Sequence, residues 1–420
     1  MQKLLLLLFL CVCSISLEAQ RDTTQQVAKG RRNSEAQMAK PYVILISADG
    51  FRHDYAPKFQ AKTLLSLSGQ GVRAEAMIPS YPTLTFPNHY SIATGLYPSH
   101  HGLVDNYFYS PQRKQFYSMS RKNAVFDGEW YGGTPLWVLA EQQQMITASY
   151  YWVGTEAAIQ GLHPTYYYNY YNDSIPIDRR IQVVIDWLQL PPQTRPHFIS
   201  FYFPRVDTDG HDFGPDASET GKAVRWVDSS IAKLTIAVQK TGLPVNFIFV
   251  ADHGMTTIDN VNMLSLPSAI DTSRFVIPRG VELVHLYARD KKDIRPTYRA
   301  LKKQELNFKA YLLKDVPRHL HYNKKDDWMG RIGDIILIPT WPKVFNLSGG
   351  RKDPGAHGYD PALVKDMNTI FYAWGPHFKS GIQIPAFENV HVYAVVTRIL
   401  GLTYTHRIDG TNSVADAILR

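Results

Sequence analysis

Three apolar runs in this chain are each followed closely by an aspartate, and this pattern limits the possible folds more than any other feature. The pairs are residues 42–47 with Asp49, residues 197–203 with Asp207, and residues 245–250 with Asp252 and His253. A continuous apolar run indicates a central strand covered on both faces, and ligand sites in open α/β sheets lie beyond the carboxyl ends of such strands. One such aspartate could simply cap a helix or fill a turn. Three together indicate a binding site at one edge of a sheet.

The chain from residue 41 onward repeats the order strand, loop, helix. Further apolar runs lie at residues 146–153, 335–338 and 369–374, and helical patterns at residues 177–190, 217–240 and 390–400. This alternation predicts a layered α/β domain with a mainly parallel sheet flanked by helices. A chain of 420 residues with 45% apolar content can bury a large core. No long linker follows residue 40, so we expect one domain over residues 41–420, in which residues 280–340 could form a subdomain.

Residues 1–19 have the pattern of a secretory signal peptide, with Lys3 before an apolar run at residues 4–12. The run is too short to remain as a transmembrane anchor. Both cysteines, Cys11 and Cys13, lie inside this segment, so the processed chain would contain none. An exported protein without a disulfide is more typical of a bacterial periplasm than of a eukaryotic secretory pathway. A lipid anchor or secretion stays open as an alternative.

The segment after the signal peptide, residues 20–40, is polar and is predicted to form a flexible leader that carries part of the net charge of +8. No basic run or nucleic-acid-binding motif accompanies this charge. We therefore expect small-molecule partners, with at most a weak attraction to anionic substrates or membrane surfaces. The sequence does not indicate which oligomeric state the protein adopts.

Seven side chains have the chemistry of a metal centre with an activated hydroxyl. They are Asp49, Thr85, Asp207, His211, Asp252, His253 and His357. His211 stands four residues after Asp207 on a glycine-containing loop, so the two can converge on one ion. Adjacent Asp252 and His253 can share an ion if their loop bends tightly. Three carboxylates and a threonine alkoxide carry four negative charges, which balance two Zn²⁺ ions, and such a neutral site can hold and polarise an anionic phosphoester.

Three motifs of the chain occur together in a known family. They are Thr-Phe-Pro-Asn-His-Tyr at residues 85–90, Leu-Tyr-Pro-Ser-His-His-Gly at residues 96–102 and Ala-Asp-His-Gly-Met at residues 251–255. From about Tyr42 to its end, the chain resembles the ectonucleotide pyrophosphatase/phosphodiesterases of the alkaline phosphatase superfamily. The resemblance implies an alkaline-phosphatase-like three-layer α/β sandwich with two zinc ions at one end. It also implies the ligands, namely Asp207, His211 and His357 for one zinc, and Asp49, Asp252, His253 and the nucleophile Thr85 for the other.

Thr85 is the expected nucleophile. A threonine hydroxyl attacks poorly at neutral pH, but coordination to a metal stabilises its alkoxide. Pro87 indicates that Thr85 stands at the start of a helix, whose N-terminus favours a phosphate. By its position in the family pattern, Asn106 would donate a hydrogen bond to a phosphoryl oxygen in the transition state. The alternative for Asn106 is an ordinary turn residue.

The segment at residues 151–156 contains no lysine or arginine. A phosphomonoesterase usually places a cation there to neutralise the extra charge, so we expect a diester substrate. Phe86 and Tyr171 match the two aromatic positions that hold a nucleobase in nucleotide-using relatives. The density of tyrosines just before Tyr171 leaves Tyr168 as an alternative. Stacking of a base between two such rings contributes about 1–3 kcal/mol.

Trp152 and Glu156 complete the expected substrate-binding residues. Glu156 stands at a position where many members of the family that the chain resembles have aspartate. It could instead be a solvated surface acid.

The resemblance implies a zinc-dependent hydrolase that cleaves nucleotide phosphodiester or pyrophosphate bonds through a threonyl-nucleotide intermediate and releases a nucleoside 5′-monophosphate. An enzyme of the same superfamily that acts on phospholipid head groups, phosphonates or phosphomonoesters stays open as the alternative. A non-enzymatic binding protein is disfavoured, because every expected metal ligand and the nucleophile are present.

Overall fold

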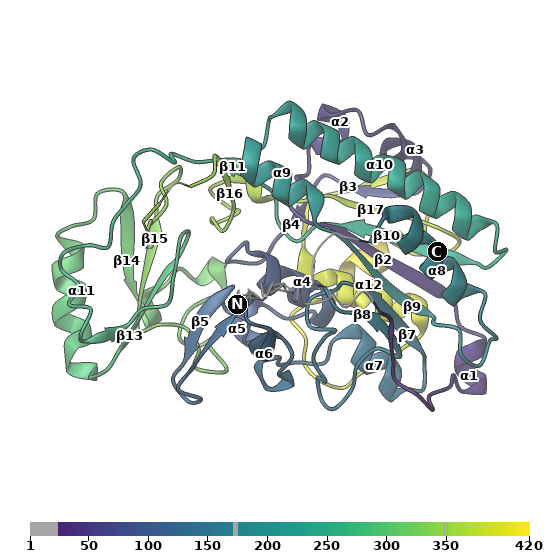
Figure 1. Ribbon diagram of the computed structural model, residues 1–420, viewed down its shortest axis with the longest axis horizontal. Coiled ribbons are helices and arrows are strands. Elements are labelled where there is room, and N and C mark those ends of the chain that lie inside the picture. The colour runs from purple at the N-terminus through teal and green to yellow at the C-terminus, as the bar shows by residue number, and fades with distance from the viewer. Residues whose placement is uncertain (1–23, 171–174, 348, 351) are drawn as a thin grey trace, which may run out of the picture.

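A large mixed sheet forms the body of the molecule, and a smaller lobe lies to one side of it (Figure 1). The computed structural model describes residues 24–170, 175–347, 349–350 and 352–420. Within these residues the large sheet has the order β1-β8-β7-β9-β2-β10-β17-β3-β18. The strands are β1 (Gln26–Val27), β8 (Tyr166–Tyr168), β7 (Thr147–Tyr150), β9 (Phe198–Phe203), β2 (Tyr42–Ala48), β10 (Val245–Val250), β17 (Phe371–Trp374), β3 (Val72–Ala74) and β18 (Ile382–Ile384).

The predicted central strands are neighbours in the middle of this sheet. β2 pairs in parallel with β9 on one side and with β10 on the other. Ser47 stands opposite both Tyr202 and Val250 in these ladders, so the carboxyl ends of the three strands meet at one edge. The predicted, mainly parallel sheet is therefore confirmed, although β17, expected from residues 369–374, pairs antiparallel with β10.

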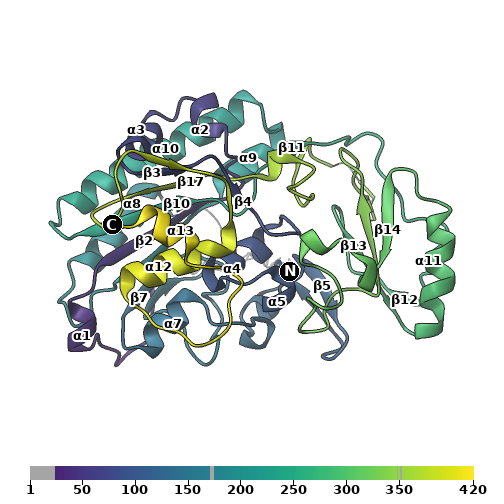
Figure 2. The ribbon, with the colours of Figure 1, turned by 180° about the vertical axis from the view of Figure 1, so that it is seen from behind.

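Helices cover both faces of the large sheet, as the three-layer prediction requires. Successive residues of β2 alternate between two cores, with Val43 and Leu45 in one and Ile44 and Ile46 in the other. The first core lies under α4 (Thr85–Thr94), α7 (Leu136–Gln142) and α12 (Val392–Leu400). The second lies under α3 (Lys62–Gln70), α8 (Ile177–Leu188) and α10 (Ser218–Gln239). Figures 1 and 2 show these two groups of helices on opposite sides of the sheet.

The smaller lobe is built on its own antiparallel sheet, of order β12-β13-β15-β14, with α11 (Ile294–Lys302) packed on it. Its strands are β12 (Phe275–Val276), β13 (Val284–Ala288), β15 (Ile335–Pro339) and β14 (Phe308–Leu312). Val284, Leu301 and Leu337 belong to a core separate from the two cores of the large sheet. The apolar run at residues 335–338 thus belongs to the lobe. The lobe overlaps residues 280–340, for which the sequence analysis considered a subdomain.

Residues 24–40 fold against the domain, so the prediction of a flexible leader is wrong for them. β1 adds to the large sheet beside β8. The Asn33 amide group donates to the carbonyls of Pro192 and Arg195 and accepts the backbone N–H of Ile146. Buried polar bonds of this kind fix a segment that is polar in composition. The predicted signal peptide at residues 1–19 and residues 20–23 lie outside the described residues.

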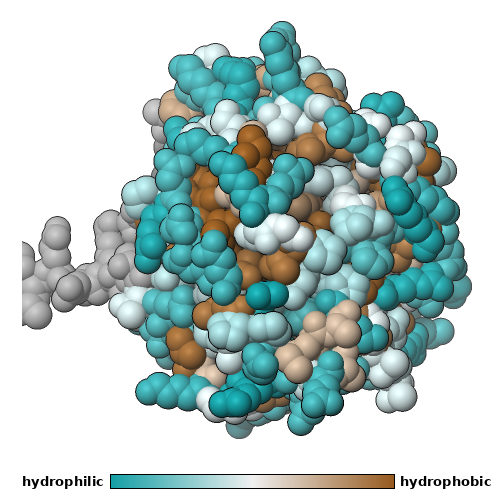
Figure 3. All heavy atoms as spheres, turned by 90° about the vertical axis from the view of Figure 1, so that its right-hand side faces the viewer, coloured by the Kyte–Doolittle hydropathy of each residue, from teal (hydrophilic) through white to brown (hydrophobic). Residues whose placement is uncertain are grey.

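The surface at the sheet end of the molecule is mostly hydrophilic, with hydrophobic side chains visible in the hollows between polar ones (Figure 3). No helix among the described residues combines the length and apolar character that a membrane crossing requires.

Candidate metal centre and nucleophile

The edge where β9, β2 and β10 end carries the predicted metal ligands. Asp49 lies in the turn after β2, and Asp252 and His253 lie in the loop after β10. Asp207 and His211 lie in α9 (Arg205–Phe213), not on the loop that the sequence suggested. A four-residue spacing places two side chains on one face of a helix, which brings this pair together without a bent loop.

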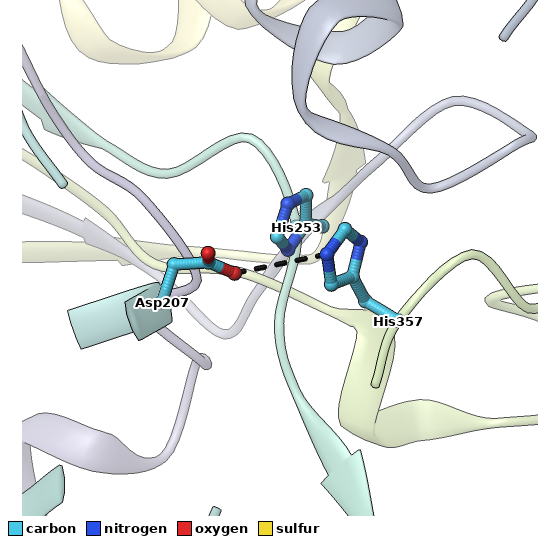
Figure 4. A group of neighbouring side chains, drawn as sticks. All are labelled: Asp207, His253 and His357. Atoms are coloured by element: carbon cyan, nitrogen blue, oxygen red, sulfur yellow. Dashed lines mark ion pairs between the residues drawn. The ribbon is translucent and has the colours of Figure 1, made fainter. Parts of the chain in front are cut away.

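One group of ligand atoms comes from α9 and from the residue after β16 (Gly355–Ala356). Nε2 of His211 lies 3.3 Å from Oδ1 of Asp207 and 3.1 Å from Nε2 of His357. Oδ1 of Asp207 lies 3.7 Å from Nε2 of His357. Figure 4 shows the Asp207 carboxylate directed at His357, with the ring of His253 beside it. The structure thus brings together the three residues assigned to one zinc.

A second group centres on Nε2 of His253. This atom lies 3.3 Å from Oδ1 of Asp49, 3.0 Å from Oδ2 of Asp252 and 3.1 Å from Oγ1 of Thr85. The rings of His253 and His357 stack with their centroids 3.4 Å apart, so the two groups adjoin. All seven predicted side chains therefore converge at one edge of the sheet.

The three histidines present the same nitrogen to the centre. Nδ1 of His211, His253 and His357 lies 2.8–2.9 Å from a backbone carbonyl oxygen, those of Gly355, Gly254 and Thr83 respectively. A carbonyl only accepts, so each Nδ1 carries a proton and donates it. This leaves the lone pair of each neutral Nε2 available as a metal ligand.

The carboxylates of the site also have oxygens that could bind a cation. Oδ1 of Asp49, Oδ1 of Asp207 and Oδ2 of Asp252 are buried and accept no hydrogen bond of ordinary geometry from the described residues. Burial and the charges of Asp252 and Asp207 raise the pKa of Asp49 well above its usual value. The ligand atoms of Asp49, Asp252 and His253 lie within 4.8 Å of one another, as do those of Asp207, His253 and His357. Buried acceptors without donors fit bound metal ions.

The surroundings of the first group shift the pKa values of its two histidines in opposite directions. Burial, together with the positive charge of its histidine neighbours, lowers the pKa of His357 to about 3. Burial alone would lower the pKa of His211 as well, but the Asp207 carboxylate raises it to about 9. The Asp207 carboxylate thus favours positive charge beside Nε2 of His211, which fits a cation held by these residues.

Thr85 is the first residue of α4, as predicted, and is half-buried. Gly254 lets the neighbouring loop close in, because a Cβ atom there would lie 1.9 Å from the carbonyl oxygen of Asp366. Asn106 is also half-buried, and its Oδ1 accepts the backbone N–H of Phe86 at 3.1 Å. With its oxygen occupied in this way, the NH₂ group of Asn106 is the part that can donate to a ligand.

The aromatic residues of the predicted substrate pocket are only partly placed beside this site. Phe86 is half-buried and packs edge-on against Tyr117, with ring centroids 6.3 Å apart. Tyr171 lies outside the described residues. Its alternative, Tyr168, is 7% exposed and stacks on Tyr150 in the core, so it has no surface for a base.

Tyr170 is an exposed aromatic residue near the site that the sequence reasoning did not single out. It is 40% exposed and packs edge-on against Tyr202, whose hydroxyl donates to Oδ2 of Asp49 at 2.5 Å. No sequence signal separates Tyr170 from its tyrosine neighbours, because strand alternation would place it on the same face as the buried Tyr168. Nothing in the sequence marks Tyr202, which lies within an apolar strand.

Trp152 and Glu156 are both buried. Trp152 is 1% exposed and donates its indole N–H to the carbonyl of His89 in α4, so a supporting role replaces the predicted contact with substrate. Glu156 accepts the backbone N–H of Tyr170 at 3.2 Å, and burial raises its pKa to about 7. With 8% exposure it is not the solvated surface acid of the alternative interpretation.

Comparison with known proteins agrees with this geometry. Residues 43–360 match the family model "Type I phosphodiesterase / nucleotide pyrophosphatase". Ectonucleotide pyrophosphatase/phosphodiesterase family member 1 of Rattus norvegicus is 34% identical over 389 residues, which cover 87% of this chain and 41% of the relative. Venom phosphodiesterase CdcPDE of Crotalus durissus collilineatus is 34% identical over 392 residues, which cover 90% of this chain and 46% of that protein. The chain thus spans less than half the length of these curated relatives.

The solved structure of murine ectonucleotide pyrophosphatase/phosphodiesterase 5 has a TM-score of 0.82 and 26% sequence identity to this chain. The match covers 90% of this chain and 100% of the murine one. Together with the family model, this likeness in fold shows that the chain belongs to the type I phosphodiesterase/nucleotide pyrophosphatase family.

Proposed function

We propose that this chain is a zinc-dependent hydrolase that cleaves nucleotide phosphodiester or pyrophosphate bonds and releases a nucleoside 5′-monophosphate. The observation that carries the proposal is the position of Thr85, whose Oγ1 lies 3.1 Å from Nε2 of His253 at the first residue of α4. A hydroxyl placed both at a helix N-terminus and beside a set of metal-ligand atoms is suited to attack a phosphate.

Two zinc ions fit the two groups of ligand atoms. Asp207, His211 and His357 would hold one ion, and Asp49, Asp252, His253 and Thr85 the other. The bound ions would supply Lewis-acid stabilisation of negative charge on the attacking and leaving oxygens. Tyr202 supports this arrangement, because its hydrogen bond to Oδ2 of Asp49 leaves Oδ1 as the ligand atom.

The reaction of the side chains follows from these positions. Oγ1 of Thr85 would lose its proton to solvent and attack phosphorus in line with the leaving group, so that a P–Oγ1 bond forms as the bond to the leaving oxygen breaks and the leaving oxygen takes up a proton from solvent. Water then cleaves the threonyl-nucleotide ester. The NH₂ group of Asn106, oriented by the hydrogen bond from Phe86, would donate to a phosphoryl oxygen as charge develops there. The N-terminus of α4 adds positive potential at the same place.

A nucleotide diester suits the surroundings better than a phosphomonoester. The segment at residues 151–156 carries no lysine or arginine to neutralise an additional phosphate charge. Phe86 and either Tyr171 or the exposed Tyr170 would hold the base between aromatic rings. An inactive variant of the murine relative was solved in complex with AMP, which supports a nucleotide for this chain as well.

The proposal is tested with a substrate panel on the purified, zinc-loaded chain. Chromogenic esters of a nucleoside 5′-monophosphate, of phosphocholine and of phosphate itself would be compared by kcat/KM. We expect the nucleotide ester to be hydrolysed fastest. Faster hydrolysis of the phosphocholine ester or the monoester would contradict the nucleotide assignment and favour the alternative members of the superfamily.

The cellular location of the protein is proposed from the sequence alone. We infer export to a bacterial periplasm from the pattern of residues 1–19 and from the confinement of Cys11 and Cys13 to that segment. Expression in a bacterial host, followed by fractionation and N-terminal sequencing, tests this inference. A full-length N-terminus on cytoplasmic protein would contradict it.

A further inference from the structure

The loop that carries Asn106 is held from the side of the lobe. This loop joins α5 (Pro98–His101) to β5 (Tyr107–Ser110). The Tyr322 hydroxyl donates to the carbonyl of Val104 at 2.6 Å, and Tyr322 is fully buried. Asp105 is 6% exposed, and its Oδ2 lies 3.4 Å from Nε2 of His285 on β13. Both residues on the N-terminal side of Asn106 therefore contact side chains from the 280–340 region.

His285 can act only as a donor toward this loop. It is 1% exposed, and its Nδ1 accepts the backbone N–H of Gly333 at 3.1 Å. The ring proton of the neutral imidazole must then lie on Nε2, which faces the Tyr322 hydroxyl oxygen at 3.4 Å as well as Oδ2 of Asp105. A buried series of donors therefore runs from the Gly333 N–H to His285, from His285 to the Tyr322 hydroxyl, and from that hydroxyl to the Val104 carbonyl.

The other side of the loop is fixed as well. Oδ1 of Asp105 accepts the backbone N–H of Tyr107 at 3.0 Å, and Oδ1 of Asn106 accepts the backbone N–H of Phe86. The backbone before Asn106, the backbone after it and its own amide oxygen are therefore all held. These three contacts together restrict the orientation of the Asn106 NH₂ group.

We propose that His285 and Tyr322 are positioning residues of the catalytic centre, which act through the Val104–Asp105 backbone to place the amide of Asn106 against the transferred phosphoryl group. The inference rests on the proposed role of Asn106. A hydrogen-bond donor stabilises the transition state only when it is aimed at the developing charge, and a displacement of about 1 Å can cost about 100-fold in rate. The lobe would then tune the rate of the reaction without touching substrate.

The test is a double-mutant cycle measured on the zinc-loaded full chain with a chromogenic nucleotide ester. Tyr322→Phe removes the donor to Val104 and keeps the ring, and we expect a roughly 10-fold fall in kcat with KM changed less than about twofold. Asn106→Ala should lower kcat by about 100-fold. In the double variant, the added Tyr322→Phe change should not lower kcat further, because there is no amide left to position.

Two further variants keep the result interpretable. His285→Gln should reproduce the loss in kcat and its disappearance in the Asn106→Ala background, so the test does not depend on the folding of one variant. Tyr311→Phe, on β14 of the same lobe, removes a hydroxyl that makes no hydrogen bond to the described residues and should leave kcat unchanged.

The outcomes separate this inference from the proposed function. An equal fall in kcat from Tyr322→Phe and His285→Gln with and without Asn106 would show a general structural effect and overturn the positioning role alone. Unchanged kcat in Asn106→Ala would overturn the assigned role of Asn106 itself, and the inference with it.

Discussion

Gly50 and Asp207 approach so closely that a Cβ atom at Gly50 would lie 2.8 Å from the Cα atom of Asp207. Gly50 also adopts the left-handed backbone conformation, with φ of +68°. The turn after β2 and the start of α9 thus press together, and this contact sets the separation between Asp49 of one ligand group and Asp207 of the other. Only glycine meets both conditions.

Gly50→Ala should therefore disturb the metal centre as well as the backbone. The left-handed conformation costs alanine about 1–2 kcal/mol, and the clash with Asp207 should add about 1–3 kcal/mol. Gly30→Ala is the matched control, because Gly30 has φ of +82° and no atom of the described residues lies within 4 Å of the added carbon. Unfolding free energy and bound zinc would be measured in both. Equal losses in the two variants would show that the contact with Asp207 does not matter.

Thr85→Ala should abolish turnover while the chain stays folded and still binds zinc. Deletion of a nucleophile costs at least about 10⁴-fold in kcat in other enzymes. Thr85→Ser should keep part of the activity, because it retains the hydroxyl at the first position of α4. Burst kinetics and single-turnover rates would be compared with the wild type. Retention of more than about a hundredth of the wild-type rate in Thr85→Ala would mean that water attacks the substrate directly.

The wild-type chain should bind two zinc ions. Elemental analysis after gentle purification tests this number, and a strong chelator should remove the activity. His211→Ala and Asp252→Ala should each reduce the zinc content to about one per chain, because they belong to different ligand groups. One metal per wild-type chain, or full activity in chelator, would contradict the two-metal centre.

Phe86→Ala should weaken catalysis on nucleotide esters more than on a small diester without a base. Loss of base stacking of about 1–3 kcal/mol corresponds to a roughly 5- to 150-fold fall in kcat/KM for the nucleotide substrate alone. Zinc content and melting temperature must stay near those of the wild type, because Phe86 adjoins Thr85. Equal losses on both substrates would show that Phe86 only supports the nucleophile.

Glu156→Gln should change how stability depends on pH. Burial raises the pKa of Glu156 from 4.5 to about 7, so the folded chain binds this proton more tightly than the unfolded chain. The contribution of Glu156 is therefore most favourable below pH 4.5, declines as the pH rises toward 7, and is constant above that. Glutamine lacks this dependence and can still accept the N–H of Tyr170.

Urea unfolding of both proteins at pH 5 and pH 8 measures the effect. Relative to the wild type, Glu156→Gln should gain stability by an amount on the order of 3 kcal/mol between the two pH values. A stability difference that is the same at both pH values would contradict a buried, proton-binding Glu156.

Local sequence was enough to predict the framework of the site. Continuous apolar runs specify buried strands wherever they occur, so β2, β9 and β10 could be identified together with the ligands that follow them. The helix start at Thr85 was predictable for a similar reason, because Pro87 in the first turn is a signal confined to a few neighbouring residues.

Other features were decided by contacts between distant segments. The residues near Asp207 do not distinguish a loop from the helix α9. The sequence around residues 24–40 likewise does not indicate that Asn33 forms a hydrogen bond with the carbonyl of Pro192. The burial of Trp152 and the exposure of Tyr170 likewise depend on what packs against them. Composition and periodicity report the preference of a segment, whereas such placements depend on its partners.

The sequence by itself determined which residues could bind metal and which strand ends would present them, because both follow from local chemistry and period. Only the tertiary structure decided how the centre is supported. The contact of Gly50 with Asp207, the bond from Tyr202 to Asp49 and the approach of His285 to Asp105 all join segments far apart in the chain. Their formation depends on the packing of the lobe and the sheet, which no local pattern encodes.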